Sequence, residues 1–186
     1  MIKDSSNSKD EDHELMERIA RGDSVAFRIL VDKHALRSLR FMERMTGNKE
    51  KAEDIVQEAF ETVWKKAPDW TPKAKFTTWF YRVLVNMAHH SFRDRFRVYE
   101  VIDDNHEDET FSTEDYIIQN ELGDAVKEAL QEIPERQRIA ITLFYYDELS
   151  QKQACEVMGI SEGALESLLS RGRSALKKKF DKVSLE

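Results

Sequence analysis

The sequence predicts an all-α protein made of two small helical domains. Apolar residues recur at helical spacing over most of the 186 residues, and only six glycines and three prolines interrupt them. A β-sandwich or barrel would need many more turn residues. No apolar run reaches the ~20 residues that span a bilayer, and the first residues lack the apolar core of a signal peptide. We therefore expect a cytoplasmic protein with no membrane insertion of its own.

The first domain is predicted over residues 14–97, after a disordered tail of residues 1–13. Its first helix is short and its second is longer, with a break between them at a Gly-Asp pair. Either Asp23 or Ser24 can cap the second helix, because both side chains accept hydrogen bonds from free backbone N–H groups. Gly47 ends that helix, since glycine adopts the left-handed conformation of a C-cap.

Two further helices complete a four-helix bundle. The third stops before Pro68, because proline lacks the N–H that would continue it, and the fourth begins near Thr77. Each carries an apolar stripe at spacings of three and four residues, typical of a helix with one buried face. The stripes are Ile55, Val56, Ala59, Phe60, Val63 and Trp64 in the third helix and Phe80, Val83, Leu84, Met87 and Phe92 in the fourth.

The charge is unevenly divided along the chain. There are 29 Lys or Arg and 36 Asp or Glu, a net charge of −7. Residues 64–97 nevertheless hold eight basic and two acidic side chains, and residues 167–182 hold six basic and one acidic. Between them, residues 98–124 hold ten acidic side chains and no Lys or Arg. We interpret residues 98–115 as a flexible acidic linker between two cationic domains, although each cationic block could also be a solvated surface.

The second domain is predicted over residues 116–186 and contains a helix-turn-helix. Ser150 and Gln153 have the spacing of a capping box at the start of a short helix. Gly159 follows that helix where a turn needs a positive φ, and Ser161 can cap the helix after it. In this motif the second helix enters the major groove of DNA. The alternative is an ordinary helical hairpin, and Cys155 is interpreted as a buried structural thiol in either case.

Taken together, these segments resemble the extracytoplasmic-function sigma factors of bacterial RNA polymerase, over about residues 14–180. Residues 52–60, Trp64 and residues 76–86 look like the polymerase-binding and −10-element helices of a sigma-2 domain. Residues 130–134, residues 138–143 and the helix-turn-helix look like a sigma-4 domain. The resemblance implies core RNA polymerase (its β and β′ subunits), promoter DNA and an anti-sigma factor as partners. It also implies transcription of a stress or envelope-response regulon, with no cofactor.

Four polar residues form the predicted polymerase-binding face. They are Asp54, Gln57, Glu58 and Glu61, which share one side of the third helix. The resemblance implies that this side docks on a coiled coil of the β′ subunit. A solvated helix face is the alternative.

A second group of residues is assigned to the −10 element. They are Trp70, Lys73, Lys75, Arg82, Asn86 and Arg93. Trp70 lies in a loop between two prolines, and the resemblance implies that this loop holds a base extruded from melted DNA. The basic side chains would hold phosphates, and an amide such as that of Asn86 can read a base. The alternative for Trp70 is a local core residue.

The −35 element is assigned to Ser167, Arg171, Arg173 and Lys177 on the last helix, with Arg171 as the main contact. Many family members carry basic residues where this chain has Glu166 and Leu168, so the −35 sequence that it reads is left open. No metal site is predicted, because the adjacent His89 and His90 point in different directions on a helix.

Two other functions remain open at this stage. A stand-alone helix-turn-helix repressor would bind a palindromic duplex by itself as a dimer. An inactivated relative would act only as an interaction protein. An enzyme is not predicted, since no nucleophile with a base, paired carboxylates or phosphate-binding glycine loop occurs in the sequence.

Overall fold

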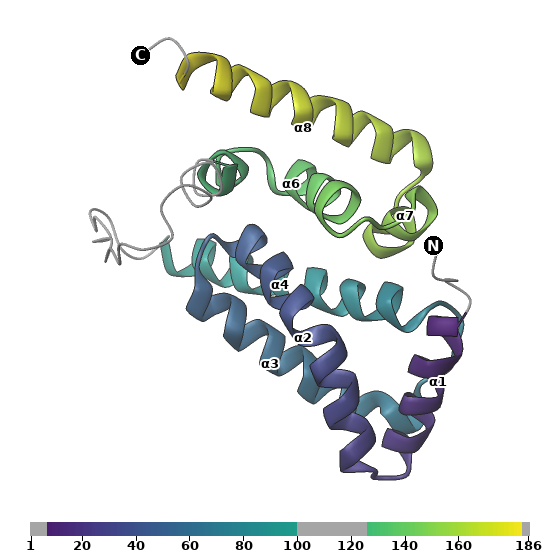
Figure 1. Ribbon diagram of the computed structural model, residues 1–186. Coiled ribbons are helices and arrows are strands. Elements are labelled where there is room, and N and C mark those ends of the chain that lie inside the picture. The colour runs from purple at the N-terminus through teal and green to yellow at the C-terminus, as the bar shows by residue number, and fades with distance from the viewer. Residues whose placement is uncertain (1–6, 100–125, 184–186) are drawn as a thin grey trace, which may run out of the picture.

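The part of the chain that the computed structural model describes consists of helices joined by short loops and contains no strand. It covers the backbone of residues 7–99 and 126–183 and the side chains of residues 11–89 and 126–180. The N-terminal unit consists of α1 (Asn7–Ala20), α2 (Ser24–Thr46), α3 (Lys49–Lys66), the short η1 (Ala67–Asp69) and α4 (Phe76–Tyr99). The C-terminal unit contains helical residues 126–131, α6 (Glu135–Ile141), the π-helical η2 (Thr142–Tyr146), α7 (Gln151–Met158) and α8 (Glu162–Val183). Figure 1 shows the two units, which confirm the predicted fold class of two helical domains.

The helix ends lie where the local signals predict them. Asp23 is the residue that caps α2, and its side chain accepts hydrogen bonds from two backbone N–H groups of the first turn. Gly47 ends α2 at a φ of 69°, and Gly159 ends α7 at a φ of 62°. Both bonds of the capping box between Ser150 and Gln153 are present, at 3.2 and 3.0 Å. The turn between α7 and α8 is thus set by local chemistry.

An aromatic cluster fills the N-terminal core between α2, α3 and α4. The rings of Phe76 and Phe80 stack with centroids 5.4 Å apart, and Phe60 packs on Phe80 at 4.8 Å. Across the core, Phe41 meets Tyr81 at 5.0 Å. Fully burying such a side chain stabilises a fold by ~1.5–3 kcal/mol. The cluster therefore fixes the first two turns of α4, which carry Arg82, one of the residues predicted to contact DNA.

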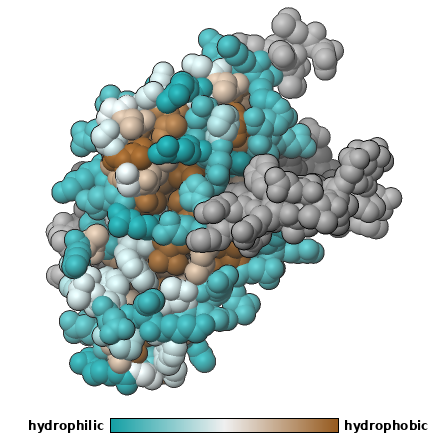
Figure 2. Space-filling view, turned by 180° about the vertical axis from the view of Figure 1, so that it is seen from behind, coloured by the Kyte–Doolittle hydropathy of each residue, from teal (hydrophilic) through white to brown (hydrophobic). Residues whose placement is uncertain are grey.

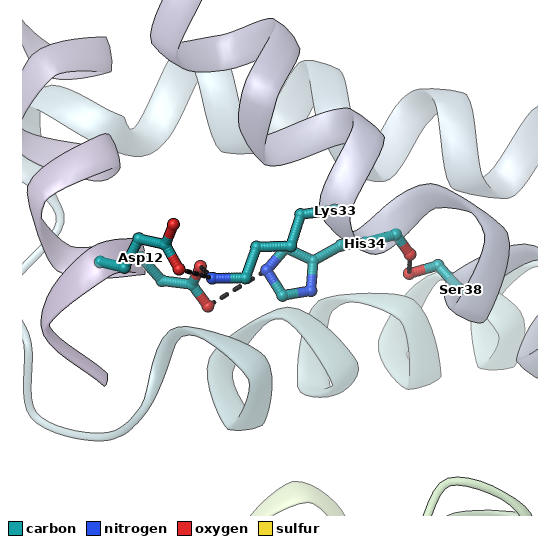
Figure 3. A network of polar contacts seen from close by, with 5 residues as sticks. Asp12, Lys33, His34 and Ser38 are labelled. Carbon is teal, nitrogen blue, oxygen red and sulfur yellow. Dashed lines mark hydrogen bonds and ion pairs between the residues drawn. The ribbon is translucent and has the colours of Figure 1, made fainter. Parts of the chain in front are cut away.

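A network of charged groups ties α1 to α2. Asp12 is 5% exposed, and its two oxygens lie 2.7 Å from Lys33 Nζ and 3.1 Å from His34 Nε2. Figure 3 shows this network, in which Ser38 also donates to the carbonyl of His34 at 2.9 Å. Burial by itself would raise the pKa of Asp12, but the hydrogen bonds from His34 and Lys33 outweigh it and lower the pKa.

This network corrects the predicted N-terminal boundary. Residues 1–13 were expected to form a disordered tail, but α1 begins at Asn7 and the Asp12 carboxylate is buried against α2. The reason is the ion pair with Lys33, a contact between residues far apart in the chain. At the other end of the unit, α4 continues to Tyr99, while residues 100–115 of the predicted linker lie outside the described residues.

In the C-terminal unit α8 lies across α6 at very close range. A Cβ atom at Gly172 would come within 2.5 Å of Ile141 Cδ1, so a larger residue there would force the Ile141 side chain to move. Leu130, Leu143 and Leu165 are fully buried around this contact. The opposite side of α8 is left exposed.

The two units are packed against each other. α7 lies along α4, and α2 contacts both η2 and α6. Figure 1 shows α4 facing α6 and α7 across this contact. The sequence predicted a linker between two domains and did not predict that the domains would be in contact.

The face of the molecule seen in Figure 2 carries both hydrophilic and hydrophobic side chains. Figure 2 shows hydrophobic areas on one face, separated by hydrophilic side chains. Large hydrophobic side chains that are exposed on the described surface include Val25, Ile29, Leu36, Trp64, Tyr145 and Tyr146. Within the described residues, every helix is too short or too polar to cross a bilayer.

Candidate functional site

A cavity of about 400 Å³ lies between the end of α3, the loop after it and the start of α4. Three of the residues predicted for the −10 element line it: Trp70, Lys73 and Arg82. The other lining residues are Thr62, Lys66, Asp69, Thr71, Ala74, Thr78, Trp79 and Val83. The cavity thus combines aromatic and cationic groups.

Trp70 is held at the rim of this cavity by two neighbouring rings. Its centroid lies 5.1 Å from that of His13 in α1 and 6.3 Å from that of Trp79 in α4. The Trp70 side chain is half-buried. Part of it packs in the core, as the alternative interpretation expected, and the rest is accessible. Sequence reasoning missed His13, because no motif links α1 to this loop.

Thr78 is a second residue that sequence reasoning missed. Its side chain is 2% exposed, and within the described residues its hydroxyl oxygen has no hydrogen-bond partner. A buried hydroxyl without a partner is unfavourable by ~1–3 kcal/mol. Thr78 is also one of the residues that line the cavity.

The remaining residues assigned to the −10 element lie outside the cavity lining. Asn86 is exposed one turn beyond Arg82 on α4, and Lys75 is half-buried just before the helix. Arg93 belongs to α4, but its side chain lies outside the described residues. His89 lies 2.9 Å from Glu135 of the C-terminal unit, and among the described residues no group of three possible ligands could hold a metal ion.

The predicted polymerase-binding residues are all exposed on α3. Asp54, Gln57, Glu58 and Glu61 lie on the side opposite the buried residues of that helix. Glu61 lies 3.2 Å from Lys65, and hydrogen bonds from Lys65 and then Gln57 lower the pKa of its carboxyl group. This face is acidic and exposed.

The helix-turn-helix presents the four residues assigned to the −35 element. Ser167, Arg171, Arg173 and Lys177 are exposed along α8. The guanidinium of Arg171 donates to the Ser167 carbonyl at 3.2 Å, and that of Arg173 donates to the Tyr145 hydroxyl at 2.9 Å. Tyr145 was not recognised in the sequence.

Buried residues of α7 and α8 hold the motif together. Leu168 is 8% exposed, so its side chain packs inside the motif. Burial therefore explains why this position is apolar. Cys155 is also buried, and its burial raises the thiol pKa, as do Glu162 and Glu166. This agrees with its interpretation as a structural thiol.

The contact between the two units engages one residue of the predicted −10 surface, Arg82, which is itself exposed. Arg82, which lines the cavity, donates a hydrogen bond to the backbone carbonyl of Glu156 in α7. Near the middle of the contact, Asp147 is 2% exposed, and Tyr81 and Arg37 both bond to it. Toward the far end, Gln131 donates to the carbonyl of Arg44 at 2.7 Å. The structure is therefore a closed arrangement of the two units.

Comparison with known proteins matches each unit to a family. Residues 30–98 match the model of sigma-70 region 2, and residues 123–176 match that of sigma-70, region 4. The chain is 30% identical to the RNA polymerase sigma-H factor of Pseudomonas aeruginosa, covering 92% of this chain and 94% of that protein. It is 29% identical to the ECF RNA polymerase sigma factor SigW of Bacillus subtilis, covering 89% and 94%.

Solved structures share the fold. CnrH in complex with the cytosolic domain of CnrY is similar with a TM-score of 0.71 and 24% identity, covering 92% of this chain and 98% of that one. The sigma factor RpoE in complex with the anti-sigma factor NepR from Bartonella quintana gives a TM-score of 0.67 and 22% identity, covering 83% and 96%.

Proposed function

This chain belongs to the extracytoplasmic-function sigma factors of bacterial RNA polymerase, and we propose that it directs the polymerase to promoters by binding their −10 and −35 elements with its two helical domains. Factors of this kind contribute binding rather than catalysis. The phosphodiester chemistry belongs to the polymerase.

The observation that carries the proposal is the cavity at the start of α4. It has the volume, the half-buried Trp70 and the cationic Lys73 and Arg82 that a base extruded from single-stranded DNA would need. Stacking of a base on an aromatic side chain contributes ~1–3 kcal/mol. Capture of such a base favours the melted form of the −10 element, so the domain would help to open the duplex.

The second domain supplies duplex binding. The exposed side of α8 carries Arg171, Arg173 and Lys177, whose charges attract the phosphates that flank a major groove. The exposed acidic face of α3, formed by Asp54, Gln57, Glu58 and Glu61, would bind basic residues of the polymerase β′ subunit. Contacts with the core enzyme then place both DNA-binding domains on one promoter.

We propose that an anti-sigma factor holds this sigma factor inactive in the closed arrangement. In this state Arg82 donates a hydrogen bond to α7, so one of the residues assigned to the −10 element is engaged by the other unit. CnrH and RpoE, whose folds are similar, were solved in complex with the cytosolic domain of CnrY and the anti-sigma factor NepR. We further propose that the regulon is a stress or envelope response.

Run-off transcription on fragmented genomic DNA tests the function. Purified chain is combined with core polymerase, and the transcripts are sequenced. New transcripts that share two upstream elements are expected only when both components are present. A repressor would instead bind a palindromic duplex without polymerase, and transcripts independent of the chain would contradict the proposal.

A further inference from the structure

We propose that Glu166 reads a cytosine in the upstream promoter element and that Gln151 holds the Glu166 carboxylate in position. The inference rests on the proposed function, because it concerns the duplex bound by the helix-turn-helix. It adds a specificity-determining residue where basic residues would be expected.

Glu166 lies where a recognition helix contacts base edges. Residues near the N-terminus of such a helix reach into the major groove. Glu166 is in the second turn of α8 and is exposed, whereas Leu165, Leu168 and Leu169 on the other side of the helix are buried. Its exposed neighbour Ser167 is small and uncharged, so it leaves room for the longer glutamate side chain.

The Glu166 carboxylate is oriented by the other helix of the motif. Gln151, the first residue of α7, donates a hydrogen bond from Nε2 to Glu166 Oε1 at 3.1 Å. For the second oxygen the structure records no partner in the part of the chain that it describes. One oxygen is therefore held by the protein, and the other remains an acceptor that faces solvent.

A carboxylate oxygen only accepts hydrogen bonds, so it disfavours bases that present acceptors in the major groove. In the major groove guanine presents two acceptors, and thymine presents an acceptor and a methyl group. Adenine presents an amino donor next to the N7 acceptor, which repels a carboxylate. Cytosine presents its N4 amino donor without an acceptor on the same base, so it is the base that fits Glu166 best.

The position of the charge is otherwise unfavourable for DNA binding. A carboxylate near the phosphates opposes association, and Arg171 and Lys177 on the same helix offset that effect. Two readings thus make opposite predictions. If Glu166 reads a base, neutralising it weakens binding to the preferred sequence; if it only repels DNA, neutralising it strengthens binding to every sequence.

The test is selection by reconstituted holoenzyme from a pool of duplexes randomised across the promoter. With the wild-type chain, we expect cytosine at one position of the upstream element. Glu166→Gln should abolish that preference and bind the selected duplex about tenfold more weakly, and Glu166→Arg should shift the preference to guanine. Gln151→Ala should weaken the cytosine preference without changing the melting temperature, which identifies Gln151 as a positioning residue.

Glu162→Gln is the matched control, because Glu162 is an exposed acid one turn earlier on α8. It should leave the cytosine preference unchanged. The inference is overturned if Glu166→Gln retains the base preference or strengthens binding to all sequences. It is also overturned if the selected base is adenine, or if Glu162→Gln rather than Glu166→Gln abolishes the preference. Selection of no upstream element at all would overturn the proposed function as well.

Discussion

The hydroxyl of Tyr81 donates a 2.7 Å hydrogen bond to Oδ1 of Asp147, and this bond joins α4 to the residue that follows η2. Arg37 Nε lies 3.3 Å from the same oxygen. Within the described residues, the other oxygen of Asp147 is buried without a partner. A buried carboxylate is unfavourable unless it is hydrogen-bonded, so Asp147 relies on Tyr81 and Arg37. Removing one of these bonds should therefore weaken the contact between the two units.

Tyr81→Phe should weaken the closed arrangement. The change leaves the ring in the core and removes one partner of a buried carboxylate, at a cost of ~1–3 kcal/mol. Faster hydrogen exchange in α4 and α7, measured by mass spectrometry on the free chain, is the expected result. Tyr145→Phe is the control, because the Tyr145 hydroxyl accepts a hydrogen bond from Arg173 within the C-terminal unit. Equal exchange in wild type and Tyr81→Phe would contradict this role.

The closed arrangement should also depend on pH. Burial raises the pKa of Asp147 above its ordinary 3.8, and the hydrogen bond from Tyr81 opposes the rise without cancelling it. The closed form therefore binds a proton more tightly than the open form, so closure is favoured at low pH and weakens as pH rises from about 4 through the raised pKa. Hydrogen exchange measured over this range should show the change. Asp147→Asn should remove it and Glu148→Gln should not; a dependence that survives Asp147→Asn refutes the assignment.

Trp70→Ala and Arg171→Ala should affect different parts of a promoter. Arg171→Ala is expected to weaken binding to −35 duplex DNA by ~1–3 kcal/mol and to have no effect on a template premelted at −10 that lacks a −35 element. Trp70→Ala should retain −35 binding and fail to hold the −10 region open. Permanganate footprinting of −10 thymines measures the opening. Identical footprints and template dependence for the two variants would show that the division is wrong.

Thr78→Val tests whether the cavity binds a base through a hydroxyl. Valine has nearly the same shape, and losing an unpaired buried hydroxyl should leave the melting temperature unchanged or raise it. Affinity of the holoenzyme for single-stranded −10 DNA should fall by ~0.5–1.5 kcal/mol, the net value of one hydrogen bond. Thr71→Val, at an exposed position of the same cavity, is the control. Unchanged affinity for Thr78→Val would exclude Thr78 from base binding.

The double variant Gln57→Ala, Glu58→Lys should weaken binding to core polymerase. Both side chains are exposed on α3, so circular dichroism and the melting temperature should match wild type. A charge reversal against basic partner residues should reduce co-purification with the core enzyme. Glu17→Lys, an exposed acid on α1, serves as the control. Undiminished co-purification of a folded double variant would reject this face as the docking surface.

Much of the candidate site was predictable because it depends on short-range signals. The exposed positions of Arg171 and Arg173 follow from the helical period of α8, and the place of Trp70 follows from the prolines around it. Thr78 carries no such signal, since its burial and unpaired hydroxyl depend on the neighbours that surround it. In the sequence, Leu168 stood out because many family members carry a basic residue there. The structure explains the leucine, because its side chain is buried in the motif.

The sequence by itself determined the helices and their ends, because caps such as Asp23, Gly47 and Gly159 act over three or four residues and the apolar period selects each buried face. It also determined the two-domain organisation through the acidic stretch between cationic blocks. Only the tertiary structure decided that the domains are closed on each other. Tyr81 and Asp147 are 66 residues apart, and neither differs locally from any other polar residue on a helix or in a turn. Their bond exists because packing of α7 on α4 removes water from both groups at once, and no pattern along the chain records that juxtaposition.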